Sequence, residues 1–162
     1  MALREHTGGG LILFSFIVAL LLTIVVLPDW ARPARPELVT MLVIYWCLMV
    51  PERFGVGTSW LIGLMMDVAQ GALLGQHALS FALIAWITLK LHQRIRVFPI
   101  WQQALSVFLL LILSEMLVLW IKGIAGHPPQ GWSYWLPSIT SMLLWPFFFS
   151  FMRTVRRYFV HA

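Results

Sequence analysis

One carboxylate lies in the middle of an apolar stretch, and it limits the folds open to this chain more than any other residue. Asp67 falls within residues 55–76 (GVGTSWLIGLMMDVAQGALLGQ), which are apolar enough to enter a lipid bilayer. An ionisable group near hydrocarbon costs about 2.5–3.5 kcal/mol on insertion scales. The fold must therefore give Asp67 a polar partner, a water-filled cavity or a position at the membrane edge.

Glycines accompany this carboxylate at a regular spacing of four residues, which on a helix places them along one face. Small residues let a second helix backbone approach closely in a membrane, and that neighbour can then satisfy the acid. An alternative stays open, in which Asp67 only caps the end of a short helix at the level of the lipid headgroups. We predict a helix-packing or partner face made of Gly57, Gly63, Asp67, Gly71 and Gly75.

The composition excludes a water-soluble domain. Of the 162 residues, 60% are hydrophobic and 10% charged, against about 45–50% and about 25% in soluble domains. The net charge of +5 indicates topology rather than nucleic-acid binding, because the basic residues lie between apolar runs. The single cysteine, Cys47, excludes an internal disulfide. We predict an all-α integral membrane protein in which residues 1–162 form a single polytopic domain.

Six apolar runs, separated by short segments rich in proline, glycine and charge, predict six transmembrane helices. The second run rises only about 22 Å, so it is packed among other helices, lies in a thinned bilayer, or forms a re-entrant hairpin. The boundary between the third and fourth runs also stays open. The predicted ranges are 11–27, 36–50, 56–72, 73–91, 99–121 and 132–152.

The distribution of basic residues predicts the topology. With six spans, eight of the eleven Lys and Arg residues lie on the side of both termini and three on the other. Basic residues concentrate on the cytoplasmic side of membranes, so both termini are predicted to be cytoplasmic. Five spans would lose part of this bias. Arg153, Arg156 and Arg157 would anchor the tail there, and they would also suit anionic headgroups or an acidic partner.

Only two acids can lie deep in the membrane, Asp67 and Glu115. Such a pair would suit a proton path or a cation site, or each acid is simply protonated or hydrogen-bonded to Ser, Thr or Trp. No Lys, Arg or His is expected at depth beside them, since His77 falls in a predicted loop. The histidines have no metal-ligand spacing, and no serine or cysteine has a base beside it. We therefore expect no metal, no cofactor and no enzymatic activity.

Several stretches form a specific combination in their order and spacing. The first connector reads PD at 28–29 and RPEL at 35–38, followed by IYWCLMVPERFGVGTSWLIGLMMDVAQGALLG at 44–75. The last helices and the tail read WQQAL at 101–105 and LLWPFFFSFMRTVRRYF at 143–159. Over essentially its full length the chain resembles the bacterial rod shape-determining protein MreD family, in its enterobacterial-type form.

This resemblance implies an inner-membrane component of the cell-elongation (rod) complex. The implied partners are the bitopic membrane protein MreC, the actin-like MreB, and the pair of RodA and penicillin-binding protein 2 that synthesises peptidoglycan. The implied fold is similar to the substrate-binding S-components of energy-coupling-factor transporters, six helices around a pocket.

Two functions follow as hypotheses. The first is a scaffold that binds MreC and couples MreB filaments to wall synthesis, with a homodimer inside the complex left open. The second is a membrane binder or transporter of a small molecule or lipid intermediate, which would use Asp67 and Glu115. An enzyme would have only those two acids and no third group to orient them.

Overall fold

The computed structural model describes residues 2–24, 37–51, 54–71, 74–126 and 135–161, and this part of the chain is helical throughout. The prediction of an all-α chain with six helices is confirmed for these residues. Whether the helices cross a membrane stays a prediction. The helices are α1 (Ala2–Ile24), α2 (Leu38–Met49), α3 (Val56–Gln70), α4 (Gln76–Arg96), α5 (Ile100–Ile124) and α6 (Leu136–His161).

The terminal helices are longer than the apolar runs that predicted them. Helix α1 begins at Ala2 rather than residue 11, and α6 continues through the basic tail to His161 rather than ending at 152. The backbone hydrogen bonds of a helix form within the helix itself, and extending a helix is easier than starting one. A helix that begins in an apolar run can therefore continue through polar residues. The ends of the predicted ranges at 25–27, 36, 72–73 and 132–134 lie outside the described residues.

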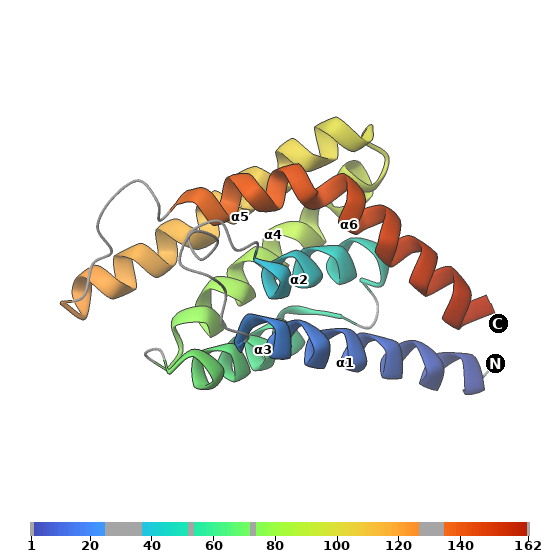
Figure 1. The fold of residues 1–162 in the computed structure, drawn as a ribbon, viewed down its shortest axis with the longest axis horizontal. Helices are drawn as coiled ribbons and strands as arrows, with labels where there is room; N and C mark the ends of the chain where they lie inside the picture. Colours follow the sequence, from blue (N-terminus) through green and yellow to red (C-terminus); the bar gives the residue numbers. More distant parts are fainter. Residues whose placement is uncertain (1, 25–36, 52–53, 72–73, 127–134, 162) are drawn as a thin grey trace.

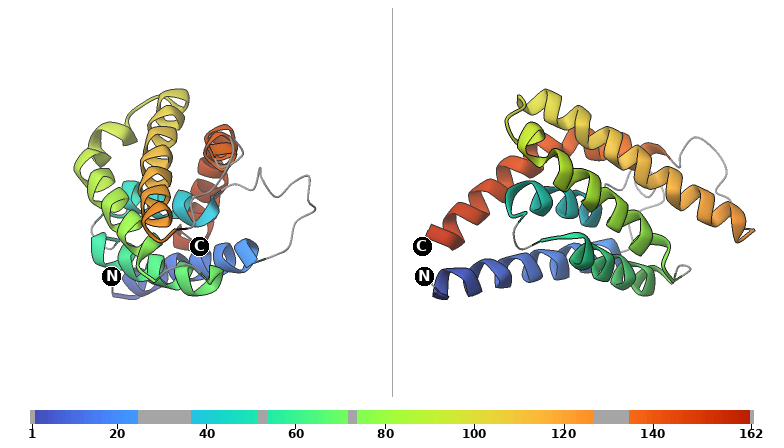
Figure 2. Two further views of the ribbon diagram at one scale, coloured as in Figure 1. Left: turned by 90° about the vertical axis from the view of Figure 1, so that its left-hand side faces the viewer. Right: turned by 180° about the vertical axis from the view of Figure 1, so that it is seen from behind.

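Helix α2 forms the centre of the bundle. Viewed from the end, α2 lies inside a ring made by the other helices (Figure 2). The ten residues from Val39 to Leu48 are all buried. Because α2 is covered by protein on every side, its length of 12 residues, about 18 Å, is set by packing rather than by lipid thickness.

Successive helices run in alternating directions along the long axis of the molecule (Figure 1). Both chain ends therefore lie at one end of the bundle, together with the turns that join α2 to α3 and α4 to α5. The turn between α3 and α4 lies at the opposite end. In this arrangement α2 is one continuous helix that runs antiparallel to both α1 and α3. The described part of residues 36–50 does not turn back on itself as a re-entrant hairpin would.

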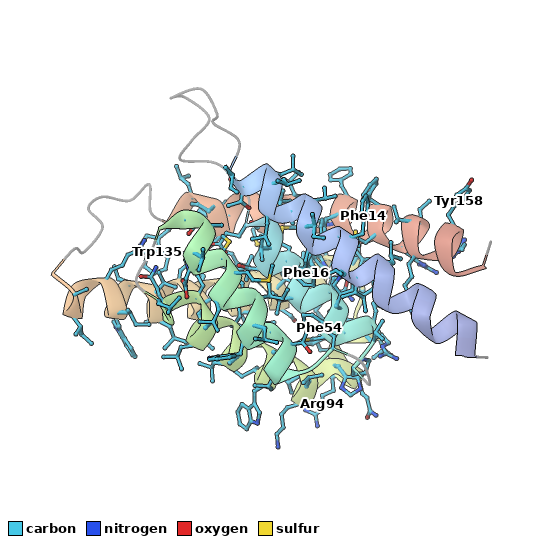
Figure 3. The ribbon with its side chains drawn as sticks, turned by 90° about the horizontal axis from the view of Figure 1, so that it is seen from below. Phe14, Phe16, Phe54, Arg94, Trp135 and Tyr158 are labelled. Carbon is cyan, nitrogen blue, oxygen red and sulfur yellow. The ribbon has the colours of Figure 1, made fainter. Side chains whose placement is uncertain are left out.

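Aromatic side chains fill the space between α2 and its neighbours. Phe16 of α1 stacks on Phe54 with ring centroids 5.3 Å apart (Figure 3). On the other side of α2, the ring of Tyr45 meets the edge of Phe149 of α6 at 5.8 Å. Such pairs add about 0.5–1.5 kcal/mol each to the burial of their area. Phe54 lies between α2 and α3, so aromatic packing holds α1 against this connection and α6 against the central helix.

The outer surface of the bundle is also apolar. Leu21, Leu109 and Phe147 are each at least 60% exposed, and similar side chains follow the outer faces of all helices except α2. Large exposed apolar patches mark membrane or protein contacts, because water disfavours them. Among the described helices, α5 is long and apolar enough to cross a bilayer, while residues 10–24 and α2 are shorter apolar segments.

Candidate functional site

Asp67 lies in the last turn of α3, is fully buried, and accepts hydrogen bonds from the start of α4. Its Oδ2 atom accepts from the backbone N–H of Gly75, and its Oδ1 atom accepts from that of His77, both at 2.9 Å. These amides have no partner inside a helix and carry the positive end of its dipole. The carboxylate therefore caps α4 from the preceding helix.

The imidazole of His77 completes this contact. Its Nδ1 atom lies 2.7 Å from Oδ1 of Asp67, and its side chain is 15% exposed. The expectation that His77 would sit in a loop, with no histidine beside Asp67, is wrong. Helix α4 begins at Gln76, so His77 lies in its first turn and faces the acid. The geometry supports the alternative in which Asp67 caps a helix end.

The glycines do not form one continuous helical face. Gly71 ends α3 with φ of 66°, and Gly75 precedes α4 with φ of 101°. This left-handed conformation is available to glycine without the steric cost that other residues incur. The predicted stripe therefore ends at Asp67, and the two later glycines shape the turn that delivers backbone amides to the carboxylate.

Gly63 has a different role, because it allows α3 and α4 to touch. A Cβ atom at Gly63 would lie 2.4 Å from Cα of Ala78 and 2.5 Å from its nitrogen. Those atoms are backbone and cannot rotate away. The absence of a side chain at Gly63 therefore lets the two helix backbones pack closely. At Gly57 an added Cβ would meet nothing within 4 Å.

A polar cavity of about 250 Å³ lies beside this hairpin, at the end of the bundle opposite the termini. Four ionisable side chains line it: Glu37 at the start of α2, His77, and Glu115 and Lys122 of α5. The Oε2 atom of Glu37 is buried and has no hydrogen-bond partner among the described residues. Acidic and basic side chains therefore line the same cavity.

The two acids singled out from the sequence are not in the same position. Glu115 lines the cavity, whereas Asp67 is separated from it by His77. Sequence reasoning missed Glu37 and Lys122 as members of this site. Both lie at helix ends, where charged residues are common. The only signal in the sequence that connects them is that both helix ends are predicted on the same side of the bundle. In the described part of the chain, no group of three acidic, histidine or cysteine side chains is arranged to hold a metal ion.

Three serines that could have satisfied the acids, Ser59, Ser80 and Ser114, have other partners. Ser80 and Ser114 hydrogen-bond to each other between α4 and α5, and Ser59 donates to the carbonyl of Gly55 at 2.9 Å. These bonds join helices or close local turns. Asp67 therefore depends on backbone amides and on His77, rather than on these hydroxyl groups.

The opposite end of the bundle carries the basic residues of the tail. Arg153 and Arg156 line a pocket together with Arg96 of α4, while Arg157 does not take part in its lining. The Nε and Nη2 atoms of Arg96 both donate to the carbonyl oxygen of Leu48, at 3.1 and 2.5 Å. Two of the three predicted anchor residues thus meet a third arginine that the sequence did not single out.

A third feature is an apolar groove between α1 and α6, with a volume of about 480 Å³. Phe14 and Val18 of α1 face Phe151 of α6 across it, and all three are exposed. Figure 3 shows Phe14 at the boundary of these two helices. Ser15 is the one polar side chain in the lining, and it already bonds to the Ile12 carbonyl and to Trp46 Nε1.

Together these features define a helical bundle that is apolar on its outside and holds its ionisable groups at its two ends, the pattern of a membrane-associated protein. The family model described as rod shape-determining protein MreD matches residues 5–155. Rod shape-determining protein MreD of Haemophilus influenzae is 30% identical over 146 residues, which cover 90% of this chain and 90% of that protein. The chain belongs to the MreD family. No solved structure matches it.

Proposed function

We propose that this chain is a multi-pass scaffold of the bacterial inner membrane that acts in the cell-elongation complex and has no enzymatic activity. Membership of a rod shape-determining family supports a role in cell elongation. The exposed apolar side chains on the outer helices support a lipid environment, since a water-facing surface of this kind would aggregate. All six helices then cross the membrane, with α2 shielded from lipid by its neighbours.

The charges support a topology with both termini in the cytoplasm. Arg94 and Arg96 of α4 and the three tail arginines lie at the end of the bundle that holds the termini. Lys122 lies near the opposite end. This asymmetry follows the preference of basic residues for the cytoplasmic side.

The observation that carries the scaffold proposal is the groove between α1 and α6. Its lining offers an apolar surface, and its exposed members Phe14, Val18 and Phe151 would face lipid in the isolated chain. A single apolar helix suits this groove, because helices in membranes associate by close packing beside small residues such as Ala19. We assign the groove to the transmembrane helix of an MreC-like bitopic partner.

Through that partner the chain would link MreB filaments in the cytoplasm to peptidoglycan synthesis by RodA and penicillin-binding protein 2. It would position proteins rather than transform a substrate. A second copy of the chain is an alternative occupant of the groove, and the ratio of the two proteins in the purified complex distinguishes these arrangements.

The test is co-purification of the tagged full chain from native membranes in mild detergent, with the bound proteins quantified by mass spectrometry. We expect an MreC-like protein in fixed ratio. Val18→Trp fills the groove and should lower partner recovery about tenfold, the loss of roughly 1.4 kcal/mol of binding free energy. Leu109→Trp, on the exposed face of α5 outside the groove, is the matched control. Equal partner recovery with both variants would exclude the groove as the binding site of the partner. If the wild type recovered no MreC-like protein, the scaffold proposal would be contradicted.

The polar cavity favours a second function, the binding of a small molecule as in S-component-like proteins. Its support is the buried oxygen of Glu37 together with Glu115, His77 and Lys122 around one cavity. A molecule with both positive and negative groups would suit this lining. Mass spectrometry of the protein purified without added ligand should reveal such a molecule, lost in Glu37→Gln and kept in Met116→Leu, a surface change outside the cavity. An empty wild-type protein would contradict this function.

A further inference from the structure

Three arginine side chains from two helices line one cavity at the end of the bundle that holds the termini. Arg96 of α4 and Arg153 and Arg156 of α6 surround a volume of about 650 Å³. The other lining side chains are uncharged and include Tyr45 and Ser150. Three positive charges therefore face one cavity with no carboxylate in its lining. We name it the arginine pocket.

One of these arginines is held in place by a neighbouring carbonyl group. Arg96 donates twice to the carbonyl of Leu48, at the negative end of α2. Tyr45, whose side chain is only 1% exposed, lines the same pocket as Arg156. Groups oriented before binding lose less conformational entropy when a ligand arrives. The arginine pocket therefore combines one guanidinium that is already oriented, that of Arg96, with the exposed Arg153 and the half-buried Arg156.

The orientation of α6 over the pocket is fixed as well. Gln103 Nε2 donates to the carbonyl of Ile95 at 3.2 Å, and Gln103 Oε1 accepts from Trp145 Nε1 at 3.0 Å. One side chain of α5 thus joins α4 to α6. Both Gln103 and Trp145 are almost fully buried, so water does not compete for these bonds.

The beginning of α5 adds to the positive potential. Ile100 and Gln103 of its first turn line the pocket. The helix follows Pro99, which makes no side-chain capping bond, and its first turn has no acidic residue. Unpaired amides at a helix start attract anions, and phosphate groups above all. Guanidinium groups bind the same ligands by paired hydrogen bonds.

The chemistry around the charges identifies the source of the anion. Pro146 and Phe149 line the pocket, and Leu143 and Phe147 on the same helix are 65% and 74% exposed. A free phosphate would leave these apolar side chains without a role. We propose that the arginine pocket binds the phosphate headgroup of an anionic membrane phospholipid, whose acyl chains lie along the exposed face of α6.

A lipid bound here would neutralise the repulsion among the three guanidinium groups and connect α2, α4, α5 and α6. This proposal goes beyond the scaffold function. The arginine pocket and the groove between α1 and α6 share no lining residue. Partner recovery and lipid binding can therefore fail separately.

The test measures the binding of fluorescent phosphatidylglycerol to the full chain in phosphatidylcholine nanodiscs. Arg153→Gln/Arg156→Gln should lower the affinity about tenfold, since each arginine near a membrane contributes a substantial share of anionic lipid binding. Arg94→Gln/Arg157→Gln removes the same charge from the same end of the bundle, outside the pocket, and should change the affinity less than twofold. Equal losses of affinity in both double variants would show that the lipid responds only to the general surface charge, and would contradict a binding site in the arginine pocket.

A second variant adds charge and removes no contact of the arginines. Ser150→Glu introduces a carboxylate into the arginine pocket, whereas Thr154→Glu places one on the same helix outside its lining. Only Ser150→Glu should weaken phosphatidylglycerol binding. Inorganic phosphate at millimolar concentration should not displace the lipid. Displacement would assign the pocket to a soluble phosphate compound, and displacement by a purified MreC-like partner would assign it to an acidic protein segment.

Discussion

Asp67 and His77 meet at 2.7 Å across the turn between α3 and α4, ten residues apart in the chain. The same carboxylate accepts two backbone N–H groups of that turn and of α4. An acid that looks costly in an apolar stretch is thus used to begin the next helix. The contact places His77 between Asp67 and the polar cavity, so the hairpin and the cavity are built from the same residues.

Replacement of Asp67 by alanine should destabilise the whole hairpin. Asp67→Ala leaves the amides of Gly75 and His77 without their acceptor in a buried setting. An unsatisfied buried donor costs about 1–3 kcal/mol. Thermal unfolding in detergent should therefore show a clear loss of stability, while Thr58→Ala, at an exposed position on α3, should change it by less than about 0.5 kcal/mol. An Asp67→Ala protein as stable as the wild type would contradict the capping role.

Alanine at two glycines of α3 should have opposite effects. Gly63→Ala forces a Cβ into the backbone of Ala78, and overpacking of this kind costs about 1–3 kcal/mol. Gly57→Ala meets open space and removes the entropic cost of glycine in a helix, so it should be neutral or stabilising by up to about 1 kcal/mol. Chemical denaturation of both variants gives the comparison. Equal stabilities would show that α3 and α4 can separate freely at Gly63.

The close packing at Gly63 also affects how partner-binding experiments are interpreted. A bulky residue at Gly63 would disturb the α3–α4 packing before it reached any partner, so lost assembly would not locate an interface. Substitutions at exposed positions such as Val18 avoid that ambiguity. Partner recovery should therefore be compared only among variants whose unfolding is unchanged.

The sequence predicted the helices well, because each apolar run is a local signal between prolines, glycines and charges. It could not predict which helix lies at the centre, since α2 and α5 are both strongly apolar. The contacts that orient the helices join residues far apart in the chain, as in Arg96 with Leu48 and Trp145 with Gln103. Spacing along one helix contains no information about such pairs, and the polar cavity was missed for the same reason.

The single cysteine provides a probe of opening at the centre of the bundle. Cys47 lies on α2 and is fully buried. A membrane-permeant maleimide should label it only after α2 is exposed, about a hundredfold or more slower than an accessible thiol. Val68→Cys in a Cys47→Ala background supplies that thiol, because Val68 is 73% exposed. Similar labelling rates at the two positions would contradict a central, shielded α2.

The buried hydrogen bond between Gln103 and Trp145 should contribute measurably to the free energy of unfolding. Trp145→Phe keeps most of the ring but removes the N–H, which leaves Gln103 Oε1 buried without that donor. The expected loss is about 1–3 kcal/mol, whereas Trp101→Phe, at a residue 67% exposed, should have little effect. Combining Trp145→Phe with Gln103→Met should cost less than the sum of the single losses, because the second change removes the unpaired acceptor. Strict additivity in this cycle, measured by chemical denaturation, would mean that the two side chains do not act as a unit.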